Sequence, residues 1–389
     1  MAYLNLEPQS FHHFFRKPFQ FYATILLLCG LIASLLYLIV PGLISPPRGP
    51  YLQSVAPDSV WVVWDTKGVT RGLVEFGTTR ALGQMIQEAR VGRHHEVQLY
   101  GLQPYTDYYY RVDSGQIASF RSAAAPDQTT FRFAVYGDTR EGAWTHRMIV
   151  AQMIKARPDF VIHTGDLVEF GDCQSCWDEF FMIAAPLLRS AAFYPTLGNH
   201  EDDQSPYART NYFDIFHLPG VERWYAFDYG NAHFISLKAD GYPAGAYFPI
   251  QEQMDWLEQE LANNDKPWLF VYFHLSVFTS TGEEFLETGL RRRLIPLFER
   301  YGVNAVFMGH KHSYERVERD GVTYITTAGG GATLYDLRQP ETGSQVAARA
   351  YHFVLVDVSG DQLHGQAIDR YGKVIDSFEL NAVQRDSRP

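Results

Sequence analysis

Residues 131–140 read FRFAVYGDTR, an apolar run that is followed at once by a glycine, an aspartate and an arginine. Short apolar runs bounded by turn residues indicate buried strands. A helical pattern follows at residues 145–156, a second apolar run at 160–163 and a second helical pattern at 177–190. Strands that alternate with helices indicate a layered α/β or α+β domain, in which helices cover the sheets.

Five apolar runs of this region end in polar clusters, where α/β folds collect functional side chains. The clusters are Gly137-Asp138-Thr139-Arg140, Gly165-Asp166, Gly198-Asn199-His200-Glu201, His274 and Gly309-His310-Lys311-His312. Any one of them alone is most simply a turn, a helix cap or a hydrogen-bonded structural histidine. Together they supply carboxylate, amide and imidazole groups, which are ligands that borderline divalent metals take. We therefore predict a metal site at these strand ends.

The order Gly-Asp, Gly-Asp, Gly-Asn-His-Glu, His, Gly-His-Lys-His resembles the signature of the calcineurin-like metallophosphoesterase superfamily. When the domain expected at residues 47–124 is included, the chain most resembles purple acid phosphatases. The resemblance implies a four-layer α+β fold over residues 129–382, with a two-layered β-sandwich flanked by helices. It also implies a dinuclear centre of two divalent or trivalent metal ions, drawn from iron, zinc, manganese and cobalt, with a bridging hydroxide as the nucleophile.

The resemblance assigns roles to the polar residues of the clusters. Asp166 would bridge the two metal ions, and His200 would be the catalytic histidine beside the leaving group. The other metal ligands would be Asp138 and His312 at the first ion and Asn199, His274 and His310 at the second.

Two positions depart from the resemblance. Many calcineurin-like enzymes have a histidine two residues after the first aspartate, where this chain has Arg140, which cannot bind a cation. Purple acid phosphatases have a tyrosine three residues after the bridging aspartate, where this chain has Glu169. Glu169, His146 from the following helix and a water molecule are the open alternatives for completing the first metal site. Arg140 is expected to bind substrate phosphate through its planar guanidinium or to form a surface salt bridge.

Residues 49–122 have short alternating segments separated by glycine and proline, which is the pattern of a small β-sandwich. Within them, GLQPYTDYYYRV at residues 101–112 resembles the tyrosine corner of a fibronectin type III-like domain, with one tyrosine turned to the backbone. We therefore expect a fibronectin type III-like domain at residues 47–124. Such a domain acts as a spacer or binds a protein partner.

Residues 21–40 read FYATILLLCGLIASLLYLIV and contain no charged residue. A helix of this length spans the ~30 Å hydrocarbon core of a membrane, and the run lacks the small-residue end of a cleaved signal peptide. Arg16 and Lys17 precede it, which places residues 1–20 in the cytoplasm. We expect a single transmembrane anchor at residues 21–43 and a catalytic domain outside the cytoplasmic membrane, on the periplasmic side if the source is a bacterium.

The chain has 33 basic and 44 acidic residues, for a net charge of -11. This balance argues against nucleic acid or an anionic lipid surface as the main electrostatic partner. Cys173 and Cys176 form a C-x-x-C motif, for which a disulfide is the simplest expectation in an oxidising compartment. The context GDCQSCW does not resemble a helix start, which disfavours a redox-active motif.

These features predict a membrane-anchored hydrolase of phosphate esters, with phosphomonoesters as the leading substrates. A phosphodiesterase acting on lipid head groups or nucleotides is the alternative, because the same metal clamp serves both reactions. A non-catalytic binding protein with a degenerate metal site is a hypothesis of another class. Arg140 and Glu169 favour it, whereas His200 and the second-site ligands count against it.

Overall fold

A computed structural model describes residues 48–201, 208–239, 251–282 and 285–383, and these belong to one compact unit, Pro47–Pro389. The expected cytoplasmic segment and the anchor at residues 21–43 lie outside the described residues, so both stay predictions. Within the described ranges, no helix has the length and apolar composition needed to cross a membrane.

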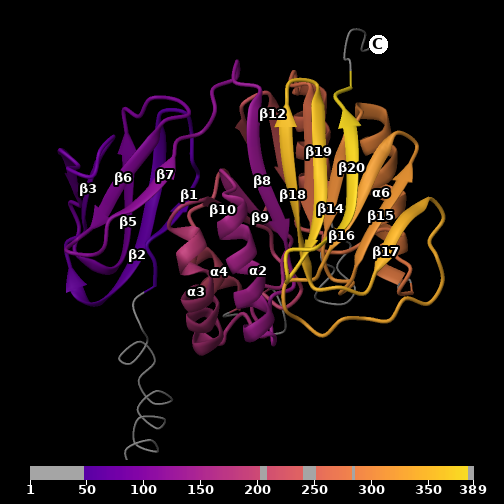
Figure 1. Ribbon diagram of the computed structural model, residues 1–389, viewed down its shortest axis with the longest axis horizontal. Coiled ribbons are helices and arrows are strands. Elements are labelled where there is room, and N and C mark those ends of the chain that lie inside the picture. Colours follow the sequence, from indigo (N-terminus) through magenta and orange to yellow (C-terminus); the bar gives the residue numbers. More distant parts are fainter. Residues whose placement is uncertain (1–47, 202–207, 240–250, 283–284, 384–389) are drawn as a thin grey trace, which may run out of the picture. The chain divides into compact units, whose positions relative to one another are not determined.

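The N-terminal part of the described chain consists of two antiparallel sheets (Figure 1). One sheet has the order β1 (Tyr51–Gln53), β2 (Ser59–Thr70), β5 (Gly92–Tyr100), and the other β4 (Gln84–Gln87), β3 (Leu73–Gly77), β6 (Asp107–Val112), β7 (Ala118–Arg121). The backbone N–H of Gln103 donates a hydrogen bond of 2.9 Å to the hydroxyl of Tyr108, which confirms the expected tyrosine turned to the backbone. Assignment of residues 47–124 to the fibronectin type III class stays a prediction.

The remainder of the chain contains two larger sheets. The first has the order β10 (Ala192–Pro195), β9 (Phe160–His163), β8 (Thr130–Tyr136), β18 (His352–Ser359), β19 (Gln362–Asp369), β20 (Val374–Asn381). The second has the order β11 (Tyr225–Tyr229), β12 (Ala232–Ser236), β13 (Trp268–Phe273), β14 (Ala305–Met308), β16 (Val322–Thr327), β15 (Tyr314–Arg319), β17 (Ser344–Ala348). Pairing is parallel from β8 to β10 and from β12 through β14 to β16. Helices connect these neighbours, as is usual for parallel strands, except that β14 reaches β16 through β15.

Helices cover the outer faces of the two sheets, which face each other through an aromatic core. The helices are α2 (Ala143–Ala156), α3 (Gln174–Leu188), α4 (Ala208–Ile215), α5 (Gln251–Asn263) and α6 (Phe285–Tyr301). Phe234 of β12 lies 5.3 Å, centroid to centroid, from both Phe133 of β8 and Phe160 of β9. Its neighbour Ile235 points the other way and packs with buried residues of α5 and α6. On the opposite side, Phe180 of α3 contacts the first sheet. The predicted four-layer arrangement is confirmed.

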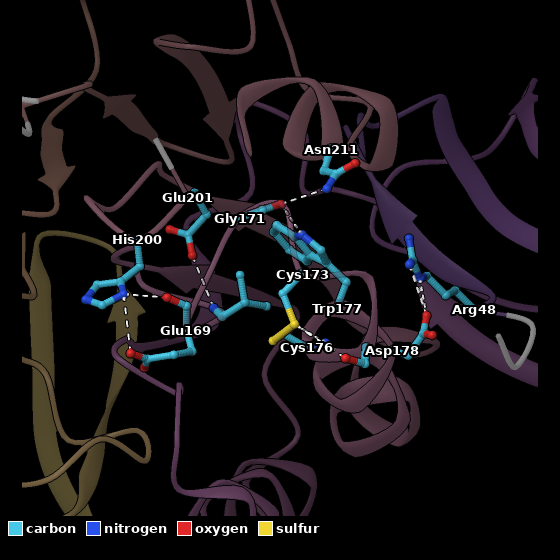
Figure 2. The surroundings of a disulfide bond; sticks show 12 residues. Arg48, Glu169, Gly171, Cys173, Cys176, Trp177, Asp178, His200, Glu201 and Asn211 are labelled. Atoms are coloured by element: carbon cyan, nitrogen blue, oxygen red, sulfur yellow. Dashed lines mark hydrogen bonds and ion pairs between the residues drawn. A yellow bond between two sulfur atoms is a disulfide. The ribbon is translucent and has the colours of Figure 1, made fainter. Parts of the chain in front are cut away.

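The C-x-x-C motif lies at the start of α3, and its two cysteines are joined by a disulfide, as expected (Figure 2). The expectation that the motif does not begin a helix is wrong, because Cys173 is the N-cap residue of α3. Its Sγ accepts a hydrogen bond of 3.2 Å from the backbone N–H of Cys176. The sulfur therefore takes the acceptor role that a serine or aspartate oxygen has at most helix starts.

The N-terminal sheets are fastened to the rest of the unit by polar contacts. Arg48 Nε donates to Asp178 Oδ1 of α3 over 3.0 Å, and the hydroxyl of Tyr110 donates to the carbonyl of Arg189 over 2.9 Å. Both pairs are at least partly buried, where a charge-assisted or fully satisfied hydrogen bond contributes more than it does in water. The two predicted domains therefore form a single packed body over the described residues.

A chain of alternating carboxylates and imidazoles also crosses this junction. His94 of β5 contacts Asp65 at 2.8 Å and Glu96 at 3.3 Å, and Glu96 in turn contacts His217 at 3.2 Å. Burial alone lowers the pKa of His94, but the hydrogen bonds to Asp65 and Glu96 outweigh it and raise that pKa to about 9. Hydrogen bonds from His217 and His94 lower the pKa of Glu96 to about 2.

This network makes the stability of the unit depend on pH. Because the pKa of His94 is raised by folding, its contribution is complete below its unfolded pKa of about 6.5 and is lost as the pH rises through about 9. The contribution of Glu96 is present above about pH 4.5 and is lost as the pH falls toward about 2. We expect His94→Gln to lower the midpoint of urea denaturation near pH 6 and to have no effect near pH 10. An equal effect at both pH values would contradict this assignment.

Candidate metal centre

Every expected metal ligand lies just beyond the end of a strand. Asp138 follows β8, Asp166 follows β9 and Asn199 follows β10, whereas His274 and His310 follow β13 and β14 of the facing sheet. Asp138, Asp166 and His310 have left-handed backbone conformations, with φ of 58°, 55° and 69°. This conformation costs a non-glycine residue about 1–2 kcal/mol. Its occurrence at three expected ligand positions indicates that the surrounding structure holds these turns in place.

The two sheets meet at this edge through the carboxylate of Asp138. The backbone N–H of His310 donates to both of its oxygens, over 3.0 and 3.1 Å. Asp138, Asp166 and His312 each offer one ligand atom, and these three atoms lie within 4.8 Å of one another. All three side chains are buried. This first group has the carboxylate and imidazole composition of a site for a borderline divalent metal.

The second group is built around the amide oxygen of Asn199. This oxygen lies 3.0 Å from His274 Nε2 and 3.1 Å from His310 Nδ1. His274 Nε2 also lies 3.2 Å from Asp166 Oδ1. Asp166 thus belongs to both groups, which is the position that a bridging ligand would occupy.

Backbone carbonyls fix the orientation of two of these histidines. His274 Nδ1 donates to the carbonyl of Thr164 over 2.9 Å, and His312 Nδ1 donates to the carbonyl of Thr333 over 2.7 Å. A carbonyl can only accept, so the neutral form of each ring has its lone pair on Nε2, directed at the neighbouring oxygens. Lone pairs that face each other require a cation between them, and an imidazole whose other nitrogen donates to a backbone carbonyl is typical of metal-binding histidines. The residues therefore fit metal ions.

The charges of the second group support the same conclusion. Burial alone lowers the pKa of His274, but the charge of Asp166 outweighs it and raises that pKa to about 10. In the protein by itself, a proton supplies the positive charge that Asp166 requires. Burial and the charge of His274 hold the pKa of His310 well below its usual range, so its ring is neutral and keeps a lone pair for a ligand bond.

His200 lies at the edge of the centre, and a hydrogen bond at Nδ1 fixes its ring. Its Nδ1 donates to the carbonyl of Glu169 over 2.6 Å, and its backbone N–H donates to Asp166 Oδ1 over 3.1 Å. Nε2 lies 3.8 Å from Asp166 Oδ2. Figure 2 shows the ring next to the Glu169 backbone. Nε2 is thus the atom that can pass a proton to a group bound at the centre.

Arg140 and Glu169, the two departures from the family pattern, pair with each other. Arg140 Nη1 lies 2.8 Å from Glu169 Oε2, and Arg140 Nε lies 3.3 Å from Asp166 Oδ2. The expected salt bridge of Arg140 is therefore present, but the Arg140 side chain is only 12% exposed, so the ion pair is partly buried. His146 packs in the core against Phe180, with ring centroids 5.5 Å apart, and burial lowers its pKa to about 3. It is not in the group of close ligand atoms found among the described residues.

Glu201 is a residue of the centre for which the sequence analysis predicted no role. Its buried carboxylate accepts hydrogen bonds from the backbone N–H groups of Asp166, Val168 and Gly198, over 2.9, 3.1 and 2.8 Å. Burial and the charge of Asp166 raise the pKa of this carboxyl. Glu201 thus fastens the loop that carries Asp166 to the loop that carries Asn199. Its position directly after Asn199-His200 was the available signal.

The comparisons with known proteins agree with this geometry. Residues 131–314 match the family model described as calcineurin-like phosphoesterase. The chain has a calcineurin-like phosphoesterase domain. Acid phosphatase type 7 of Mus musculus is 28% identical over 386 residues, which cover 82% of this chain and 87% of that protein. Probable purple acid phosphatase 20 of Arabidopsis thaliana is 28% identical over 342 residues, which cover 76% of this chain and 78% of that protein.

A solved structure shows that the phosphoesterase has the purple acid phosphatase fold. The purple acid phosphatase from seeds of yellow lupin (Lupinus luteus) superposes with a TM-score of 0.76 at 21% identity, over 89% of this chain and 77% of that one. The predicted superfamily is confirmed. The roles of the individual ligands stay predictions.

Glu201 provides a test of how the centre is supported. Glu201→Gln keeps the size of the side chain but turns an N–H toward the backbone donors, which separates the two ligand loops. We expect a loss of 10- to 100-fold, roughly, in affinity for Zn²⁺ or Mn²⁺, measured by calorimetric titration of the metal-free protein. Glu379→Gln on the exposed face of β20 is the matched control. Wild-type affinity in the Glu201 variant would show that the hydrogen bonds between Glu201 and the two loops do not support metal binding.

Proposed function

We propose that the phosphoesterase hydrolyses phosphate monoesters at a dinuclear metal centre. The proposal rests on the position of Asp166, which belongs to both ligand groups. It lies between His312 and Asp138 on one side and His274 on the other. Two metal ions held there would clamp the phosphoryl group and supply a hydroxide nucleophile near neutral pH.

The protein side chains have separate tasks in this reaction. Asn199 is a neutral ligand through its amide oxygen, which leaves its amide N–H groups free to contact a phosphate oxygen. His200 Nε2, in protonated form, donates to the oxygen of the leaving alcohol, and its contact with the Glu169 carbonyl keeps the ring in that orientation. The guanidinium of Arg140, beside Asp166, pairs with a phosphoryl oxygen. A monoester offers more unsubstituted oxygens to these groups than a diester does.

Hydrolysis of p-nitrophenyl phosphate and of bis(p-nitrophenyl) phosphate by the metal-loaded protein tests this function. We expect turnover of the monoester to exceed that of the diester. Asp166→Asn and His310→Ala should each lower kcat/KM by more than about 10², because each removes several kcal/mol of stabilisation by the metals. His364→Ala is the matched control, because His364 lies on β19, which carries none of the expected ligands. Preference for the diester would favour a phosphodiesterase, and metal binding without turnover of either ester would favour a binding protein.

Arg140 gives a separate prediction for the substrate. Arg140→Ala removes a charge-assisted hydrogen bond to phosphate, which is worth about 1.5–3 kcal/mol, so we expect KM for the monoester to rise at least about tenfold. Metal content, measured by mass spectrometry, should be close to that of the wild type, because arginine is not a ligand. Arg140→Lys should restore part of the loss. Unchanged kinetics would remove Arg140 from the substrate site.

A further inference from the structure

The disulfide at the start of α3 lies close to the catalytic machinery and has no role in the function proposed above. Cys176 lines a cavity together with Arg140, Glu169 and His146. Cys173 is the N-cap residue of α3, and Figure 2 shows the disulfide near Gly171 and Glu169, which precede the helix. Both cysteines are partly exposed. The bond is therefore accessible to a reagent in solution.

The local structure favours a stable thiolate at Cys173. Its Sγ accepts a hydrogen bond from the Cys176 N–H over 3.2 Å, and the hydroxyl of Ser175 lies 3.4 Å from the same sulfur. A helix of this length directs the positive end of its dipole at its N-cap. Hydrogen-bond donors and a helix N-terminus next to a sulfur stabilise the thiolate that forms there, which favours exchange with other thiols. Cys176, by contrast, is packed in part against the hydrophobic core.

A purely structural purpose explains this bond poorly. The cysteines are separated by only three positions in the sequence, and a disulfide constrains the unfolded chain least when the loop that it closes is short. The same turn is already closed by the hydrogen bond from the Cys176 N–H to the Cys173 carbonyl, 3.0 Å long. The bond thus contributes little to the stability of the whole fold, and what it constrains is local, the position of Cys173 relative to Cys176.

The segment from Glu169 to Cys173 connects the disulfide to the catalytic histidine. Its Glu169 carbonyl accepts from His200 Nδ1 over 2.6 Å, and its Gly171 N–H donates to the His200 carbonyl over 2.9 Å. Cys173 N–H donates to the carbonyl of Phe170 over 3.0 Å. The five-residue segment therefore holds the His200 ring at one end and is tied to the first turn of α3 at the other.

We propose that Cys173–Cys176 is a thiol–disulfide exchange site, that its reactant is a dithiol, and that its oxidation state sets the orientation of His200. A thiolate of the dithiol attacks Cys173 Sγ, the S–S bond breaks, and Cys176 leaves as a thiolate that takes up a proton. The second thiol of the reactant loses its proton and attacks the reactant sulfur of the mixed disulfide, which releases Cys173 as a thiolate. The reactant becomes a disulfide, and its two electrons reduce the two protein sulfurs.

Reduction removes the covalent link between Cys173 and Cys176, so the end of the segment at Cys173 is held to the first turn of α3 by backbone hydrogen bonds alone. The contact between the Glu169 carbonyl and His200 then loosens. Proton donation to the leaving group then becomes less effective, whereas Asp138, Asp166 and the other ligands keep their own supports. We expect kcat to fall about fivefold on reduction, the scale of a weakened general acid rather than a lost one. KM and metal affinity should change less than twofold, within the same experiment, because neither depends on His200 orientation.

The test uses the full-length, metal-loaded protein in buffers of fixed ratios of oxidised to reduced dithiothreitol. Alkylation followed by mass spectrometry of the peptide with Cys173 and Cys176 reports their oxidation state separately from Cys29, and kcat for p-nitrophenyl phosphate is measured in the same samples. We expect the two readouts to change together in one two-electron transition. The Cys173→Ser/Cys176→Ser variant should have the kcat of the reduced protein in every buffer. It also controls for metal binding by dithiothreitol.

A second variant pair tests which sulfur is attacked. Cys176→Ser should form a mixed disulfide with glutathione disulfide at Cys173 faster than Cys173→Ser does at Cys176. Only the kcat readout rests on the proposed function, so a chain with no esterase activity would still report exchange through its thiols. The proposal is overturned if the disulfide is reduced only when circular dichroism shows unfolding, if Cys176 reacts first, or if kcat is the same in both oxidation states.

Discussion

Asp166 is a carboxylate with almost no exposure to solvent, and the structure around it serves to balance its charge. An uncompensated buried carboxylate costs several kcal/mol. Burial raises the pKa of Asp166, but the positive charges of His274, His200 and Arg140 outweigh this effect and lower it. The groups that lower this pKa follow strands of both large sheets. The environment of the Asp166 carboxylate therefore depends on how the two sheets face each other. Metal ions are the natural partners of such a site, because they concentrate more charge in less space than any side chain does.

The sequence predicted those parts of the fold and site that depend on local patterns. The apolar run of β8 followed by Gly137-Asp138 identifies a strand with a ligand at its end, and such runs gave the layered architecture and the six expected ligand positions. Tyr108 was predictable because the tyrosine corner is a local motif. The helix at residues 145–156 begins two residues earlier, at Ala143, because its first turn lacks the apolar periodicity that marks the rest.

Features made by residues far apart in the sequence were not predictable in this way. Glu201 binds the backbone of Asp166 and Val168. Its position after Asn199-His200 places it near the centre, but it does not indicate that these N–H groups would face the carboxylate. The start of α3 at Cys173 was missed because sulfur is an uncommon helix cap. Arg140 and Glu169 each look like a lost ligand when read alone. In the structure they form one ion pair. The guanidinium of Arg140 lies beside Asp166, and the carboxylate of Glu169 partly neutralises the charge of Arg140.

Two metal ions that share Asp166 can be located by diffraction from metal-loaded crystals at the absorption edge of the bound metal. We expect two anomalous peaks about 3.5–4 Å apart, one within reach of Asp138 and His312 and the other within reach of Asn199, His274 and His310. A single peak, or two peaks of which only one lies next to Asp166, would contradict this expectation.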